Sequence, residues 1–387
     1  VGNFVPFTDN GTIAKSCMFN SPDDPKLGKT FSGAGTNTTW TFSCWIKLGI
    51  KTSNGRRMIF SAGSAGSNYG GAEIGSTGDD SIEFYNYYGG SYDWRLVTNR
   101  QLEDTSKWYH LLFVSDTTNS TESDRARIYI DGERVTSFST ASYPSLNYAN
   151  NFWMGTTEHE IGTSIFTTQN FDGYMAEVNN VDGSVVLPST FGVTDTSTGR
   201  WIPKALTGIT YGTNGFRLQF GSSSNLGDDT SGNTNDFSVT NLVAGDQTTD
   251  SPTQNFATHD PNFSGTIGLS EGNLKVSGTQ NLSYQTAYVG KNVNSGKWYF
   301  EVTATTVPTF FLIGLATLDG HANAKTTYVG DNAGSYGYQF APGGIHYIYY
   351  DGSNTDLGSG SSLSNGNIVG VAYDADTGAF WVAVNNT

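Results

Sequence analysis

Alternation of apolar and polar residues is the strongest pattern along the first half of the chain. It is clearest at Trp40, Phe42, Cys44 and Ile46 and returns at Ile128 and Ile130. Successive side chains of a β-strand point to opposite faces, so a period of two predicts strands with one buried side. No window carries a convincing apolar stripe with the helical period of about 3.6 residues. The pattern therefore predicts an all-β fold.

Residues 1–185 contain nine strand candidates, separated by turn-forming residues. They cover 16–19, 39–49, 56–63, 81–88, 94–99, 107–116, 127–135, 151–156 and 171–178. Many short strands with turns between them are typical of an antiparallel sandwich or barrel. We therefore expect residues 1–185 to form one β domain.

A hairpin is predicted near the C-terminus, at 367–385. Two apolar strands flank the turn DADTG, in which Gly378 can take the positive φ that closes a hairpin. Three further strand candidates precede it at 295–304, 310–316 and 335–340. We therefore expect residues 263–387 to form a second β-sandwich.

Residues 186–262, between the two expected sandwiches, show little regular structure. Several prolines interrupt this stretch, and a proline lacks the backbone N–H that helices and strands need. A long segment without secondary structure of its own is uncommon in compact proteins. We therefore expect this extended connector to pack on a neighbouring domain.

Composition agrees with a β-rich protein and narrows the classes of partner. The 387 residues include 48 glycines and 13% aromatic residues, against only 14% charged residues. The formal net charge is −15 and the pI is near 4.6, so we expect no electrostatic capture of nucleic acid. No run of 18 apolar residues occurs, so we predict no membrane insertion.

Cysteine and histidine offer little chemistry. Cys17 and Cys44 are the only cysteines, and we expect both to be buried as small apolar residues. The five histidines lack the spacing of metal ligands, so no zinc site is predicted. The chain begins with Val1 and stops at Thr387, just after a predicted strand, and we expect it to be a piece of a longer protein.

Two sets of strings carry family resemblances. The strings WTFSCWIK, KWYHLLFV, IYIDGE and FDGYMAEV, in this order, resemble the laminin G-like, concanavalin A-like jelly roll. The strings SGKWYFEVTA, FFLIGLA and SYGYQF, followed by the hairpin, resemble a SPRY-type sandwich. That fold binds partners and is not known for catalysis. The resemblances imply two antiparallel sandwiches and no enzymatic activity.

The connector strings YGTNGFRLQF, DTSGNTNDF and DSPTQNF complete a succession that resembles virion surface proteins of tailed bacteriophages. The resemblance implies display on the virion surface, contact with other virion proteins, and binding of a host-surface glycan or receptor. It also implies a homo-oligomer, with a trimer favoured, although no coiled-coil heptads are present. Weak sites displayed in several copies attach tightly through effective concentration.

Two aromatic stretches have the composition of a carbohydrate site. Sugars offer apolar C–H faces and hydroxyl groups, so their sites combine exposed aromatic rings with polar side chains. The candidate residues are Tyr85, Tyr87, Tyr88, Tyr92, Asp93, Trp94, Tyr347, Tyr349 and Tyr350. Alternate residues of a strand face the core, so core or cross-strand packing is the competing explanation for any one of these rings.

Concanavalin A-like jelly rolls also include glucanases, which carry carboxylates at alternate positions of one strand. The nearest match offers Glu158 and Glu160, with Gly162 where a third carboxylate should stand. Glu177 is followed at the alternate position by Asn179. The pattern is incomplete, and we predict no catalytic residues.

Residues 229–235, DTSGNTN, alternate oxygen-bearing side chains as a calcium loop does. The glycine stands too early in this loop, however, and Thr240 occupies the place of the bidentate glutamate. A polar turn is the better interpretation, and we assign no cofactor. The family resemblance still leaves room for Ca²⁺ at the sandwich rim, with no ligands identified.

The sequence thus predicts a non-enzymatic phage virion surface protein, such as a tail fibre, that binds a host glycan or receptor. Two alternatives stay open. The chain could be a capsid decoration or head-fibre component, which would show contacts of about 1,600 Å² with other virion proteins. It could instead be a depolymerase of surface polysaccharide, with two carboxylates about 5–10 Å apart in one cleft.

Overall fold

The computed structural model describes residues 11–49, 55–75, 78–149, 152–165, 169–196, 198–259, 268–270, 273–277, 295–317 and 327–385. The chain divides into two compact units. The N-terminal unit comprises Val5–Thr258 and Ser270–Asn273, and the C-terminal unit comprises Val1–Phe4, His259–Leu269 and Leu274–Thr387. Helical structure in the described part of the chain consists of three-residue 3₁₀ turns. None of these described helices is long and apolar enough to cross a membrane. The prediction of an all-β protein is confirmed.

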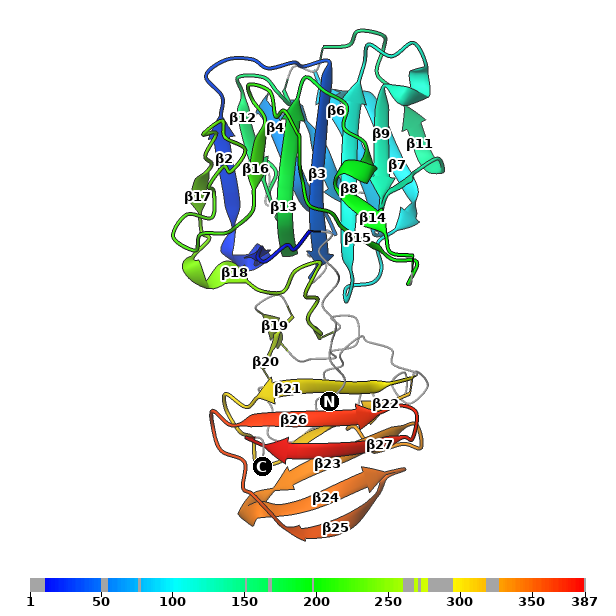
Figure 1. Cartoon of the computed structure of the whole chain (residues 1–387), viewed down its shortest axis with the longest axis vertical. Coiled ribbons are helices and arrows are strands. Elements are labelled where there is room, and N and C mark those ends of the chain that lie inside the picture. The colour runs from blue at the N-terminus through cyan, green and yellow to red at the C-terminus, as the bar shows by residue number, and fades with distance from the viewer. Residues whose placement is uncertain are drawn as a thin grey trace. The chain divides into compact units, whose positions relative to one another are not determined.

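The first sheet of the N-terminal unit contains eight antiparallel strands (Figure 1). Its order is β10 (Glu133–Arg134), β9 (Ala126–Ile130), β8 (Trp108–Asp116), β3 (Thr39–Leu48), β13 (Gly173–Asp182), β1 (Ser16–Phe19) and β18 (Gln247–Thr248), with β16 (Phe216–Leu218) also paired to β13. β8, β9 and β10 are consecutive in the chain, whereas β3 pairs with β8 and β13, and β13 with β1, across long stretches of sequence, as in a jelly roll.

The second sheet also contains eight antiparallel strands and lies against the first (Figure 1). Its order is β11 (Phe138–Ser142), β7 (Ser91–Gln101), β6 (Ser81–Tyr88), β5 (Asn68–Ile74), β4 (Arg57–Ala65), β12 (Glu158–Ile161), β2 (Lys26–Thr30) and β17 (Ser238–Thr240). The inner sides of the two sheets enclose one hydrophobic core. The N-terminal unit is therefore a β-sandwich.

Aromatic side chains fill the space between the two sheets. The alternating residues of β3 that were predicted to face inward are all buried: Trp40, Phe42, Cys44 and Ile46. The ring of Phe60 in β4 meets them, with its centroid 4.2 Å from that of Phe42 and 4.4 Å from that of Trp153. Cys17 and Cys44 are free and buried, so the prediction made for them is confirmed.

Residues 186–258 lie within the expected connector, 186–262, which was predicted to pack on a neighbouring domain, and they belong to the compact N-terminal unit. They supply β16, β17 and β18 to its two sheets. They also cover the outer side of the first sheet, where Phe191 packs with Leu112 and Val114 of β8. A small hairpin, β14 (Gly192–Thr194) with β15 (Trp201–Pro203), lies in this covering segment. The first compact unit therefore extends to Thr258 instead of ending at residue 185.

One buried ion pair attaches the end of this covering segment to the first sheet. Nζ of Lys47 in β3 lies 2.9 Å from Oδ2 of Asp250, and both side chains are fully buried. Trp108 donates its indole N–H to the other carboxylate oxygen, at 3.0 Å. Lys47 also donates to the carbonyl oxygen of Phe256, at 2.6 Å. Each charge is therefore paired and hydrogen-bonded, which offsets part of its desolvation cost.

The C-terminal unit is a second antiparallel sandwich. One sheet has the order β21 (Lys297–Thr303), β26 (Ile368–Asp374) and β27 (Ala379–Val384). The other has the order β22 (Phe311–Ala316), β23 (Ser335–Ala341), β24 (Ile345–Tyr350) and β25 (Ser353–Ser359). Both sheets contribute to one core of Ile313, Phe340, Val369, Val371 and Val384. The prediction of two sandwiches is confirmed.

The predicted C-terminal hairpin is present as β26 and β27. Its turn contains Gly378 with a φ of 73°, and the Gly378 N–H donates to the carbonyl oxygen of Asp374 at 2.8 Å. Only glycine adopts this backbone region at little cost. A further pair of short strands, β19 (Gly268–Ser270) and β20 (Lys275–Ser277), forms a separate two-stranded sheet.

We predict that Asp250→Ala lowers the free energy of unfolding of the N-terminal unit by about 3 kcal/mol, because it leaves the Lys47 ammonium buried without its counter-charge. Urea denaturation followed by tryptophan fluorescence measures this change. The matched control is Asp124→Ala, which removes the half-exposed pair with Arg134 and should cost less than about 1 kcal/mol. Equal losses in the two variants would contradict the role given to Asp250.

Candidate functional site

The outer side of β5, β6 and β7 carries a cluster of tyrosines and ion pairs. Ile82 and Phe84 of β6 face the core, so the alternate residues Glu83, Tyr85 and Tyr87 point away from it. Across the strands, Tyr69 pairs with Tyr87, Glu73 with Glu83, Tyr87 with Tyr92, and Tyr85 with Arg95. We call this group the tyrosine face and define it as Arg56, Tyr69, Glu73, Glu83, Tyr85, Tyr87, Tyr92 and Arg95.

Four tyrosine rings of the tyrosine face contact one another. The ring centroid of Tyr87 lies 5.3 Å from that of Tyr69 and 5.0 Å from that of Tyr92. Tyr85 lies below them, 5.8 Å from Tyr69 and 5.6 Å from Tyr92, and only 1% of it is exposed. Tyr69 and Tyr87 are half-buried, whereas Tyr92 is exposed. The upper three rings therefore form a fixed aromatic surface supported by the fourth.

Two ion pairs lie beside and beneath these rings. Arg95 donates its Nε to Oε1 of Glu83 at 2.7 Å and a terminal nitrogen to Oε2 at 2.9 Å. Arg56 donates its Nε to Oε1 of Glu73 at 2.9 Å. Both carboxylates are fully buried, while about a quarter of each arginine side chain is exposed. The bidentate geometry of Arg95 fixes its guanidinium, whose carbon atom lies 4.5 Å from the centre of the Tyr92 ring.

Burial changes the acidity of this cluster. It raises the pKa of Glu73 to about 7, although the hydrogen bond and the charge of Arg56 oppose the change. Burial, together with the charge of Glu83, raises the pKa of Tyr92 to about 12. Burial also raises the pKa of Tyr85 well above its ordinary value. The hydroxyls of Tyr85 and Tyr92 are therefore neutral hydrogen-bond donors at neutral pH.

Two polar atoms of the tyrosine face have no hydrogen-bond partner. These are the second carboxylate oxygen of Glu73 and the hydroxyl group of Tyr85, and both are buried. An unsatisfied buried polar group costs roughly 1–3 kcal/mol. Such groups are rare in folded proteins and mark places where a water molecule or a ligand hydroxyl would gain a bond.

Two of the predicted ligand-binding residues belong to the tyrosine face as exposed or half-buried rings, namely Tyr87 and Tyr92. Tyr85 also belongs to it, but its ring is covered, so its prediction as a surface ring is wrong. The prediction for Trp94 is wrong as well, because Trp94 faces the core and packs edge-to-face on Phe84 with centroids 4.7 Å apart. Tyr85 points outward but lies beneath its neighbours. A register shift at Asp93, between the pairs Asn86–Trp94 and Tyr87–Tyr92, turns Trp94 to the core side.

Tyr88 and Asp93 lie outside the tyrosine face. Tyr88 follows Tyr87 and so points to the opposite side of β6, where its ring lies 6.1 Å from Phe152. Asp93 is exposed and accepts a hydrogen bond from the hydroxyl of Tyr148 at 2.5 Å. Both lie at the rim of the sandwich.

The other three predicted residues lie in β24 of the C-terminal unit. Tyr349 donates its hydroxyl to Oε1 of Gln339 at 3.3 Å. Tyr350 is exposed and stacks on Tyr336, with centroids 4.4 Å apart and an angle of 16° between the ring planes. Tyr347 is half-buried beside Tyr349. The structure therefore does not bring the two predicted aromatic stretches into one cluster within either unit.

Sequence reasoning missed the charged half of the tyrosine face, which comprises Arg56, Glu73, Glu83 and Arg95. One signal was available. In residues 81–88 the outward positions carry Glu83, Tyr85 and Tyr87. Two large aromatic residues beside a single charged residue are unusual on the solvent side of a strand, and this composition could have indicated a partly buried cluster there. The partners of Glu83 are on other strands, and their pairing depends on sheet register.

The carboxylates considered for a glucanase site do not converge. Glu160 in β12 is buried and pairs with Lys26 at 2.5 Å in the second sheet. Glu177 in β13 pairs with Arg217, also at 2.5 Å, in the first sheet. Their strands belong to opposite layers of the sandwich.

The polar loop at 229–235 uses its oxygen atoms internally. The carboxylate of Asp229 accepts backbone N–H bonds from Arg217, Ser231 and Asn235, at 2.8, 2.9 and 2.8 Å. Asn233 and Asn235 donate their side-chain amides to the carbonyl oxygen of Gly215, each at 2.9 Å. Within the described ranges, no group of three or more His, Cys, Asp and Glu side chains is placed to hold a metal ion.

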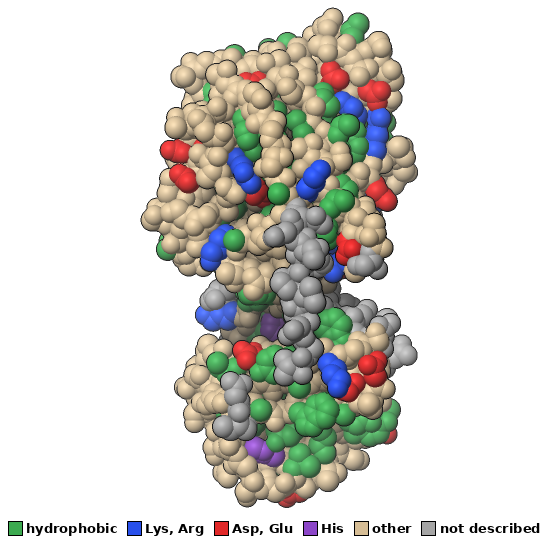
Figure 2. Space-filling view, viewed as in Figure 1, with side chains coloured by type: hydrophobic (Ala, Val, Ile, Leu, Met, Phe, Trp, Pro, Cys, Tyr) green, Lys and Arg blue, Asp and Glu red, His purple; other side chains and the backbone are tan. Residues whose placement is uncertain are grey.

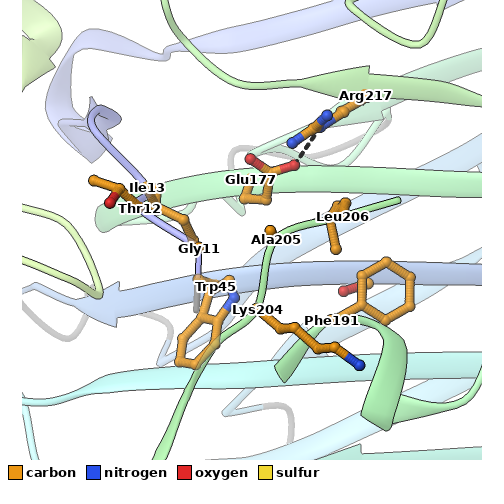
Figure 3. A pocket seen from close by; sticks show the side chains of 11 residues that line it. Gly11, Thr12, Ile13, Trp45, Glu177, Phe191, Lys204, Ala205, Leu206 and Arg217 are labelled. Atoms are coloured by element: carbon orange, nitrogen blue, oxygen red, sulfur yellow. Dashed lines mark hydrogen bonds and ion pairs between the residues drawn. The ribbon is translucent and has the colours of Figure 1, made fainter. Parts of the chain in front are cut away.

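A small cavity lies on the outer side of the first sheet, beneath the covering segment (Figure 3). The lining includes Trp45, Lys204 and the Glu177–Arg217 ion pair, which Figure 3 shows at one side. The cavity volume of about 40 Å³ suits water molecules, whereas ligand pockets typically measure about 300–1,000 Å³. It is therefore not a site for a sugar ring.

Residues 28–185 match the Laminin_G_3 family model, described as the concanavalin A-like lectin/glucanases superfamily. The jelly roll of the N-terminal unit therefore has a laminin G-like, concanavalin A-like fold, and the match covers less than half of the chain. It includes every residue of the tyrosine face. No curated protein matches the chain.

Several solved structures are similar to parts of the chain. A heptameric SAP-like pentraxin from Limulus polyphemus is 14% identical over 46% of this chain and 80% of its own, with a TM-score of 0.33. Tailspike protein 2 from an Escherichia coli bacteriophage is 14% identical over 46% of this chain and 27% of its own, with a TM-score of 0.30. Domains LG4-5 of the mouse laminin α1 chain are 8% identical over 98% of this chain and 78% of their own, with a TM-score of 0.35.

We predict that Glu73 makes the stability of the N-terminal unit depend on pH. Its pKa is raised from 4.5 to about 7 on folding, so its favourable contribution is full below pH 4.5 and is lost as the pH rises through about 7. Relative to Glu73→Gln, the wild type should therefore lose stability over that interval. Urea midpoints of both proteins across that interval measure the difference. The exposed control Glu133→Gln should give a flat difference, and a flat difference for Glu73→Gln as well would contradict the prediction.

Proposed function

We propose that this chain binds carbohydrate through the tyrosine face and catalyses no reaction. The observation that carries the proposal is the fixed surface of Tyr69, Tyr87 and Tyr92, with ion-paired carboxylates and arginines at its base. The lectin-like family match of the same domain supports it.

The chemistry of the tyrosine face suits a sugar. The apolar side of a pyranose ring can stack on a tyrosine ring, which loses little entropy because its neighbours already hold it. The exposed parts of Arg56 and Arg95 can donate hydrogen bonds to ring or hydroxyl oxygens. A hydroxyl group that reached the base would also satisfy the free oxygen of Glu73 or the Tyr85 hydroxyl.

Charge favours a neutral ligand. Arg95 is neutralised by Glu83, and Arg56 lies beside the partly ionised carboxyl group of Glu73, so at most part of one positive charge remains there for an acidic sugar. The chain as a whole carries a formal charge of −15, which repels polyanions. We therefore propose neutral hexoses as the ligand class.

The setting that we propose is the surface of a bacteriophage particle. It rests on the resemblance of the connector strings and of the order of modules to phage virion surface proteins. In that setting the C-terminal unit is SPRY-like, the protein contacts other virion proteins as a homo-oligomer such as a trimer, and the ligand is a host-surface glycan. Neither nucleic acid nor membrane insertion has a part in it.

A depolymerase is the second candidate, because Glu73 and Glu83 face each other across β5 and β6. The raised pKa of Glu73 would suit a general acid. Against this, both carboxylates are fully buried and each is bonded to an arginine. A glycosidic bond needs direct access to both groups. We therefore favour binding.

We predict that Tyr92→Ala and Tyr87→Ala each weaken binding of a neutral oligosaccharide about tenfold, because each removes one stacking ring. A glycan array with neutral and acidic oligosaccharides identifies the ligand, and calorimetric titration measures the affinities. Tyr88→Ala is the matched control, since it removes a neighbouring ring on the opposite side of β6. If Tyr88→Ala weakened binding as much as Tyr92→Ala, the ligand would not be bound at the tyrosine face as proposed.

We predict that the protein releases no reducing sugar from the polysaccharide that it binds, because neither carboxylate of the tyrosine face can reach a glycosidic bond. A reducing-end assay over many hours measures release, with Glu83→Gln as the comparison. Release by the wild type that is absent from Glu83→Gln would establish the depolymerase instead.

A further inference from the structure

The outer side of the three-stranded sheet in the C-terminal unit carries two exposed aromatic rings in one row. Tyr299 of β21 pairs with Ala372 of β26, and Ala372 pairs with Trp381 of β27. Tyr299 is 57% exposed and Trp381 is 59% exposed, more than any other described aromatic residue. Their strand neighbours Phe300 and Val382 pack against the core, so the two rings point outward.

The hydroxyl end of the Tyr299 side chain is held against the neighbouring strand. The hydroxyl donates to Oε1 of Glu301 at 2.8 Å. A Cβ atom added to Gly370 would lie 2.5 Å from that hydroxyl and 3.2 Å from two ring atoms. The phenol end of the ring therefore occupies the space above Gly370, and a residue with a side chain there would displace it. More than half of Tyr299 remains exposed and can stack on a ligand.

The floor between the two rings is made of small residues. Gly370 and Ala372 lie in β26, and Ala383 pairs with Gly370 from β27. Adjacent strands are about 4.8 Å apart, so the backbones of β21 and β27 lie about 10 Å apart. The hydroxyl end of Tyr299 reaches over Gly370 of the middle strand, so both aromatic side chains border the same small residues. Figure 2 shows hydrophobic side chains gathered on this surface, over β26 and β27.

We propose that Tyr299 and Trp381 form a second carbohydrate site, which binds a neutral hexopyranose chain across the three strands. The two rings stack on sugar units, and the small residues of β26 and β27 leave room for the chain beside them. The carboxylate of Glu301 accepts a hydrogen bond from a sugar hydroxyl. A carboxylate at the edge of the row favours a hydroxyl-rich ligand over a purely apolar partner surface.

This second site does not depend on the tyrosine face, because it lies in the other compact unit. A chain with two separate sugar sites binds a polymer more tightly than either site alone, through effective concentration. The gain grows further if several copies are displayed together.

The full chain is titrated calorimetrically with cellohexaose and with chitohexaose as probes. At least one of them should bind, and Trp381→Ala and Tyr299→Ala should each weaken that binding about tenfold. Trp298→Ala is the matched control. Trp298 lies two residues before the core-facing Phe300 in β21 and therefore points to the same side, away from the proposed site. Its indole N–H donates to the Ser295 carbonyl oxygen at 2.8 Å. This variant should leave the affinity within about twofold.

Gly370→Ala separates the geometry of the site from its composition. It keeps both aromatic rings and displaces that of Tyr299, so binding should weaken several-fold while the unfolding transition of the C-terminal unit stays cooperative. Unchanged affinity in this variant would show that the position of the Tyr299 ring over Gly370 is not needed for binding, and it would overturn the proposal.

Three further outcomes would overturn it. One is the absence of binding to either hexasaccharide. Another is a loss of binding on Tyr92→Ala but not on Trp381→Ala, which would place the ligand on the tyrosine face and so support the proposed function alone. The third is an oligomer in sedimentation velocity that Trp381→Ala dissociates, which would make this face a contact between copies. If the tyrosine-face variants kept their affinity and Trp381→Ala lost it, the result would instead support this second site alone.

Discussion

The packing of aromatic rings between the two sheets of the N-terminal unit sets the position of everything else. Phe60 lies 4.2 Å from Phe42 and 5.5 Å from Phe113, so rings from β3, β4 and β8 interlock across the sandwich. A strand that slipped by one residue would exchange its two faces. In β6 such a slip would turn Glu83 into the hydrophobic core and Phe84 to the outer side. The cost of that exchange fixes the register, and the register places the tyrosine face on the outside.

The outer surfaces of the two sheets of this sandwich are covered to different extents. Residues 186–258 cover the first sheet, and the buried Lys47–Asp250 pair fastens the end of that covering segment. On the second sheet, Thr163 accepts a hydrogen bond from Ser61 and the adjoining segment covers part of β4. On the outer sides of β5, β6 and β7, Tyr92 is exposed and Tyr69 and Tyr87 are half-buried. The proposed ligand would meet the N-terminal sandwich at these rings, whereas the described outer side of the first sheet carries a cavity of about 40 Å³.

The tyrosine face also buries two carboxylates, and the loss of their hydration costs free energy. Glu73 and Glu83 are fully buried although they point away from the core, because tyrosine rings and arginine side chains surround them. Buried ion pairs contribute little net stability, since the loss of hydration offsets their attraction. We take their value to be geometric: Arg95, held by two bonds to Glu83, keeps the Tyr92 ring in place. In the C-terminal unit, Gly370 leaves room for the hydroxyl end of Tyr299 and Glu301 accepts its hydrogen bond, so these two residues also keep an aromatic side chain in place.

The sequence by itself determined many of the strands, because a period of two is local: Trp40 to Ile46, the hairpin around Gly378 and the burial of both cysteines all follow from neighbouring residues. The strand expected at 151–156 is wrong, because the described residues 152–156 form turns and bends, and β2 and β5 were not anticipated. The family resemblance of residues 28–185 was readable from strings in the same way. Which rings of 85–94 are accessible depended on partners elsewhere. Tyr85 is hidden because Tyr69 and Tyr92 close over it, and Trp94 is hidden because β7 turns it toward Phe84. The pairing of Glu73 with Glu83, and the attachment of 186–258 to the first sheet, arise from contacts between residues distant in the chain. Such contacts are decided by the packing of the whole domain, so only the tertiary structure could supply them.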